Sequence, residues 1–113
     1  MAIETWSRQA RKGVLELCIL LLLEKGEMYG YDVVKLLSSL HGLVIAEGTV
    51  YPLLSRLKKE GLLKARIVES SAGPPRKYYA ITSKGIQKAR VMFESWMELS
   101  RSVSSLSKGR NHV

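Results

Sequence analysis

Apolar residues recur along most of this chain at spacings of three and four, which is the period of an amphipathic helix. The first such stripe predicts a core helix over residues 14–25 that ends at Gly26. Its members are Val14, Leu17, Cys18, Leu21 and Leu22. Residues 1–12, which precede it, are mixed and basic and predict a loose arm or a helical lead-in.

A turn at residues 28–32 leads into a second predicted helix that ends near Gly42. Its expected core stripe is Val33, Leu36, Leu37 and Leu40. Val44 and Ile45 predict a short extended piece.

The third predicted helix, Gly48 to Glu60, has two chemically different faces. Its apolar stripe is Val50, Leu53, Leu54 and Leu57. The opposite face offers hydroxyls and long cations, which hydrogen-bond to phosphates and base edges in a DNA groove. It carries Tyr51, Ser55, Arg56, Lys58 and Lys59. A proline costs about 3 kcal/mol in a helix interior, but Pro52 is expected within about one turn of the start, where the cost is smaller.

The pattern then changes to short strands and ends in a long helix. Residues 62–68 and 77–82 favour strands, and the Ser, Gly and Pro residues of 70–75 are typical of a hairpin tip. From a cap at Thr82 or Ser83, a helical pattern runs to Leu106 with a broad apolar stripe. The stripe comprises Ile86, Ala89, Phe93, Trp96, Met97, Val103 and Leu106.

This order of elements predicts a mainly α, α+β fold, namely a winged helix-turn-helix domain over residues 1–82. Residues 83–107 are expected to form a C-terminal dimerisation helix, and residues 108–113 a disordered tail. A small winged domain has no obvious surface to cover the long stripe, so a homodimer is the economical explanation. The interface residues would be Ile86, Ala89, Phe93, Trp96, Met97 and Val103.

Charge indicates the partner. The 113 residues carry a formal net charge of +8, which favours a polyanion such as nucleic acid. An anionic membrane surface is the rival polyanion, but the last helix lacks the continuous basic face that would bind it. The longest apolar run, residues 17–23, is too short to span a bilayer. With one cysteine, Cys18, no intrachain disulfide can form, and a reducing cytoplasmic setting fits best.

Catalytic motifs are missing from the sequence. It has no Gly-rich phosphate loop, no nucleophile elbow and no His, Asp and Glu cluster, so we expect neither an enzyme nor a cofactor or metal site. The alternatives that remain beside DNA binding are a basic RNA-binding protein and a protein-interaction module without operator specificity. The low strand content argues against the first.

Several motifs together resemble the PadR family of bacterial transcriptional regulators, in particular its small members with a single C-terminal helix. These motifs are residues 15–23, 29–32, 48–54, Arg56, Leu57, Gly61, Leu62, 76–79, Ile81, Thr82 and Gly85. The resemblance implies a dimeric repressor that binds a palindromic promoter site on double-stranded DNA. Its expected DNA contacts are Tyr29, Thr49, Tyr51, Pro52, Ser55, Arg56, Lys59, Arg76 and Lys77.

Some members of this family bind planar aromatic compounds in a pore at the dimer interface, lined by a tryptophan of the last helix. Residues 93–96 resemble that segment. By this resemblance, Trp96 and Phe93 are the expected effector-binding residues. Aromatic rings on such a stripe more often pack in an interface between subunits than form a ligand platform, so interface packing is the alternative for both residues.

Overall fold

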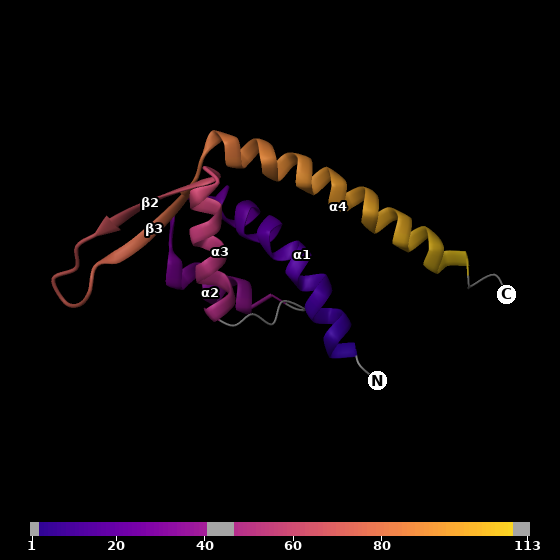
Figure 1. Cartoon of the computed structure of the whole chain (residues 1–113), viewed down its shortest axis with the longest axis horizontal. Helices are drawn as coiled ribbons and strands as arrows, with labels where there is room; N and C mark the ends of the chain where they lie inside the picture. The colour runs from indigo at the N-terminus through magenta and orange to yellow at the C-terminus, as the bar shows by residue number, and fades with distance from the viewer. Residues whose placement is uncertain (1–2, 41–46, 110–113) are drawn as a thin grey trace.

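The computed structural model describes residues 3–40 and 47–109, which form four helices and a small sheet (Figure 1). In chain order the elements are α1 (Ile3–Leu23), β1 (Met28–Tyr29), α2 (Gly30–Ser38), α3 (Glu47–Lys59), β2 (Leu63–Val68), β3 (Arg76–Ile81) and α4 (Ser83–Gly109). The extended piece predicted at Val44 and Ile45 lies outside the described residues.

The core lies between α1, α2, α3 and the base of the sheet. α3 contributes Val50, Leu54 and Leu57, all fully buried, as its stripe predicts, while Leu53 is partly buried beside them. The other large, fully buried side chains are Ile19, Leu20, Leu23, Val33, Leu37 and Leu62. One apolar side of α3 is therefore committed to the core, and its opposite side faces outward.

The first two helices differ from the prediction. α1 begins at Ile3, so the segment before residue 14 is the helical lead-in and not a loose arm. α2 ends at Ser38, and Leu36 and Leu40 are 45% and 52% exposed, so their predicted place in the core stripe is wrong. Val34 is buried instead, because the core-facing side of this short helix runs through Val33, Val34 and Leu37.

The sheet is antiparallel, with strand order β1-β3-β2. β2 and β3 form the predicted hairpin, in register from Leu63 opposite Ile81 to Val68 opposite Arg76. β1 is a two-residue strand that the sequence did not reveal; it pairs Tyr29 with Tyr78. The hairpin projects from one side of the helical body as a wing, whereas α4 leaves the body in a different direction (Figure 1).

α3 ends in a Schellman motif. The N–H of Gly61 donates to the carbonyl of Lys58, and that of Leu62 to the carbonyl of Leu57, each at 3.0 Å. Gly61 has φ +79, a left-handed conformation that favours glycine. The helix begins at Glu47, so Pro52 lies in its second turn and not near its start as expected; it removes the backbone bond that would reach the carbonyl of Gly48.

Thr82 caps α4 and joins it to the end of α3. Its hydroxyl accepts a hydrogen bond from the N–H of Gly85 at 3.0 Å and donates to the carbonyl of Gly61 at 2.7 Å. The helix continues to Gly109, past the predicted boundary at residue 107. α4 starts beside α3 and the sheet, so its first turns are part of the core. Its later turns extend beyond the core.

Gly85 allows this close approach. A Cβ at this position would collide with the carbonyl oxygen of Leu62 and lie 2.6 Å from Cγ1 of Ile81. We therefore expect Gly85→Ala to lower the free energy of unfolding by about 2–3 kcal/mol through overpacking, measured by urea unfolding at one protein concentration. Gly48→Ala is the control, since nothing lies within 4 Å of a Cβ there. Equal unfolding midpoints for the two variants would contradict the account.

Candidate nucleic-acid interface

The outward face of α3 presents most of the side chains expected to contact DNA. Thr49, Pro52, Ser55 and Lys59 are exposed, and Lys58 is exposed beside them. Tyr51 is 37% exposed, with its ring near Gly30, where a Cβ would lie 3.4 Å from Cε1 of the tyrosine. The burial of Val50, Leu54 and Leu57 on the other side fixes this orientation.

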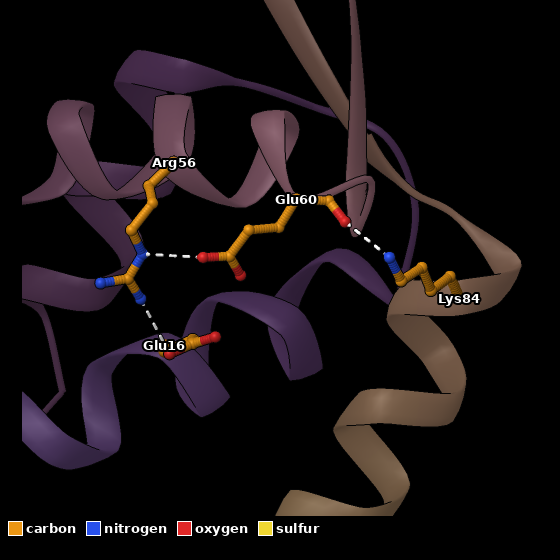
Figure 2. A network of polar contacts seen from close by, with 4 residues as sticks. All are labelled: Glu16, Arg56, Glu60 and Lys84. Atoms are coloured by element: carbon orange, nitrogen blue, oxygen red, sulfur yellow. Dashed lines mark hydrogen bonds and ion pairs between the residues drawn. The ribbon is translucent and has the colours of Figure 1, made fainter.

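Arg56 behaves differently from the rest of this face. Its Nη2 donates to Oε2 of Glu16 at 2.9 Å, and its Nε lies 3.4 Å from Oε2 of Glu60 (Figure 2). Two carboxylates therefore hold the guanidinium that the sequence assigned to DNA. Glu16 lies forty residues away on α1, and no local sequence signal indicates this pairing.

Aromatic and cationic side chains lie close together where β1 pairs with β3. The guanidinium of Arg76 lies 4.9 Å from the ring centroid of Tyr29, a cation–π contact. The Tyr29 ring is 5.7 Å from Tyr78 and 6.1 Å from Tyr31, with tilted planes. Tyr29 is only partly exposed, whereas Arg76 and Lys77 are exposed. The stacking limits the directions in which the Arg76 cation can point.

An ion pair that the sequence did not reveal fixes β2 to the loop after α1. Nε and Nη2 of Arg66 donate to the two carboxylate oxygens of Glu27 at 2.8 and 2.6 Å. These hydrogen bonds, together with the charge of Arg66, lower the pKa of the Glu27 carboxyl, while raising the pKa of Arg66. Both groups are exposed to solvent, so the pair orients the wing more than it stabilises the fold.

A second feature, the apolar groove, lies between α1 and the later turns of α4. It has a volume of about 740 Å³. It is lined by Trp6, Ala10, Gly13, Val14, Leu17, Val91, Met92, Ser95, Trp96, Leu99, Ser100, Val103 and Ser104. Trp6 and Trp96, one from each helix, are 65% and 40% exposed.

The structure divides the residues expected at a subunit interface into two groups. Phe93, Trp96, Met97 and Val103 are exposed on α4, and two of them, Trp96 and Val103, line the groove. Ala89 instead is fully buried in the core of its own chain, so it has no surface to offer a partner, and Ile86 is partly buried. The sequence missed Trp6 as a lining residue because its segment carried no clear helical stripe.

Other chemistry is sparse in the part of the chain that the structure describes. Residues 3–40 and 47–109 contain no group of three or more His, Cys, Asp or Glu that could hold a metal. None of the described helices is long and apolar enough to cross a membrane. Burial raises the pKa of the Cys18 thiol and so favours its neutral form.

Three helices, the third of which has an exposed polar face, and an antiparallel wing define a winged-helix DNA-binding protein. Residues 19–91 match the family model of the transcriptional regulator PadR-like family, and the chain belongs to that family. It is therefore a DNA-binding transcriptional regulator and not an enzyme. The family gives no support to the alternatives of an RNA-binding or protein-interaction module.

Solved structures of similar proteins agree. A PadR-like transcription factor from Bacteroides fragilis is 45% identical, with 90% of this chain and 98% of that chain covered and a TM-score of 0.74. A PadR-like transcriptional regulator from Bacillus cereus is 42% identical, with 87% and 95% covered and a TM-score of 0.77. A PadR family regulator from Eggerthella lenta is 33% identical, with 93% and 91% covered and a TM-score of 0.84.

We expect Arg76→Ala to weaken binding to all duplexes alike and to reduce the slope of log affinity against log salt by about one per protomer, as loss of a phosphate contact does. Arg76→Lys, which keeps the charge but loses the planar stacking on Tyr29, should keep the slope. Arg101→Ala removes a cation from the exposed surface of α4 and serves as a matched control. If the salt slope of Arg76→Ala equals that of the native protein, Arg76 does not contact a DNA phosphate.

Proposed function

We propose that this regulator is a homodimeric repressor that binds a palindromic promoter site. The observation that carries the proposal is the apolar groove, because its two walls are the free parts of α1 and α4, on the side of the molecule away from the wing (Figure 1). Such a regulator would act in the cytoplasm, in contact with the chromosome.

The second copy is the best occupant of the groove. Val91, Leu99 and Val103 are each more than half exposed along α4, which makes a longer apolar surface than a monomer usually leaves in water. α4 has 27 residues, or about 40 Å of helix at 1.5 Å per residue. Packing it into the groove of an identical chain, with the two roles exchanged by a two-fold axis, buries both surfaces at once.

A two-fold axis also matches a palindromic site. Two α3 helices would enter successive major grooves, about 34–36 Å apart, and the wings would lie over flanking phosphates. The side of α3 that faces the major groove would present Thr49, Tyr51, Pro52, Ser55 and Lys59. Contacts beside the major groove would come from Tyr29, Arg76 and Lys77. An occupied promoter excludes RNA polymerase, which gives repression.

The interface between the two copies also suggests how repression is released. A planar aromatic effector could stack on Trp96, with Phe93 nearby on α4. It would shift the separation of the two α3 helices only if it binds the DNA-free arrangement more tightly than the DNA-bound one. The serine side chains of the groove, from Ser95, Ser100 and Ser104, could orient polar substituents of such a compound.

We expect Leu99→Glu to disrupt the dimer, because it places a charge in the middle of an apolar contact, and to lower affinity for a two-site duplex at least tenfold. Sedimentation velocity and gel-shift titration are the measurements. Ser105→Glu, an equal change of charge at an exposed position outside the groove, should leave the dimer intact. An intact Leu99→Glu dimer would place the interface elsewhere.

In a Trp6→Phe background, we expect planar aromatic dyes to quench the fluorescence of Trp96 and to lower operator affinity. Trp96→Ala should weaken dye binding about tenfold, in line with the loss of one aromatic stacking contact. Titration of a dye panel by fluorescence anisotropy measures this. Unchanged fluorescence together with unchanged operator affinity across the panel would remove the effector from the proposal.

A further inference from the structure

We propose that Arg56 is a positioning residue that holds the DNA-facing helix α3 against α1, and not a residue that contacts DNA. The inference rests on the proposed function, because it takes α3 as the helix that reads the operator. It concerns one end of that helix, where side chains of α1, α3 and α4 meet (Figure 2).

The guanidinium is held through two of its nitrogen atoms. Glu16 of α1 accepts from Nη2 at 2.9 Å, while Glu60, directly after the end of α3, lies 3.4 Å from Nε. The planar guanidinium of an arginine cannot rotate freely when two of its nitrogens are engaged. In the pair of Arg56 with Glu16, the side chain of Glu16 is 21% exposed and that of Arg56 is 55% exposed. The guanidinium therefore lies over the surface of α1.

Charge opposes a direct role in DNA binding. The three side chains together carry one positive and two negative charges, so a phosphate that approached Arg56 would also approach Glu16 and Glu60. Binding such a phosphate would gather three anions around one cation. Lys59, on the same helix, is exposed and forms no ion pair within the described residues, and so is better suited to such a contact.

A second contact ties the same end of α3 to α4. Nζ of Lys84 donates to the backbone carbonyl of Glu60 at 2.9 Å (Figure 2). The C-terminal end of α3 is thus held from two directions, by α1 through Glu16 and by α4 through Lys84. The same turns of α1 also line the apolar groove with Gly13, Val14 and Leu17, so Arg56 links the groove wall to the DNA-facing helix.

An exposed ion pair of this kind contributes little to stability, but it can fix an angle. Base-edge hydrogen bonds need donor and acceptor within a few tenths of an ångström and 10–20° of the productive geometry, roughly, whereas phosphate contacts tolerate more. Loss of the pair should therefore reduce sequence preference while general DNA affinity and the melting temperature change little.

The test compares Glu16→Gln with Arg56→Gln in the full-length protein. The probes are a duplex selected from a random pool by the native protein and a scrambled duplex of equal length, each titrated over a salt series. Both variants should lower the preference for the selected duplex alike, by roughly threefold per protomer and so roughly tenfold for a dimer, at an unchanged salt slope. Glu16 is the informative position, because it lies on α1, outside the DNA-facing helix, and contacts Arg56.

The opposite pattern overturns the inference. If Arg56 contacts phosphate, Glu16→Gln will leave or raise DNA affinity by freeing the arginine, and Arg56→Gln alone will reduce the salt slope by about one per protomer. A native protein that selects no preferred duplex overturns the proposed function and the inference with it.

A charge exchange separates positioning from folding. The double variant Glu16→Arg with Arg56→Glu again places one cation between two carboxylates. It should recover the preference of the native protein, even where a single variant melts too low to be titrated. Persistent loss of preference in a double variant that melts like the native protein would overturn the inference.

Discussion

The structure depends on the burial of one side of α3. Val50, Leu54 and Leu57 have no exposed surface, and they pack into a core that α1, α2 and the sheet complete. A helix fixed in this way must turn its other side outward, so the same apolar contact that stabilises the domain also presents the polar face for DNA. At about 1.5–3 kcal/mol for each fully buried aliphatic side chain, this contact is far stronger than the ion pairs around it.

Weak polar contacts then refine what the core has placed. Thr82 and Lys84 join the start of α4 to the end of α3, Arg56 joins that end to α1, and Arg66 joins the wing to Glu27. Each of these contacts contributes less to stability than the buried core, but together they fix the angles between the elements. These contacts connect α1 and α4, which line the groove, to the end of the DNA-facing helix α3.

Local periodicity was enough to predict α3, the wing and α4 as elements. In α3 the spacing of apolar residues matches the face that is buried, whereas most of the apolar stripe of α4 is exposed in the single chain. It failed where the tertiary context decides: Leu36 is apolar but exposed, and Ala89 belongs to the core of its own chain and not to an interface. β1 is too short to have a pattern, and the pairing of Arg56 with Glu16 joins residues far apart in the sequence. The sequence was enough to predict which face of α3 carries the candidate DNA contacts. It was not enough to predict which cations of that face form ion pairs within the chain.

The most direct measurement of the central claim is the affinity of the purified protein for duplex DNA from its own upstream region, against an unrelated duplex of equal length. The titration should span a salt series, with the mass of the complex determined in solution. We predict a complex of one dimer per site that prefers the upstream DNA by roughly a hundredfold or more, within the usual specificity range. Weak binding that is equal for both duplexes and leaves a monomer in solution would contradict the account.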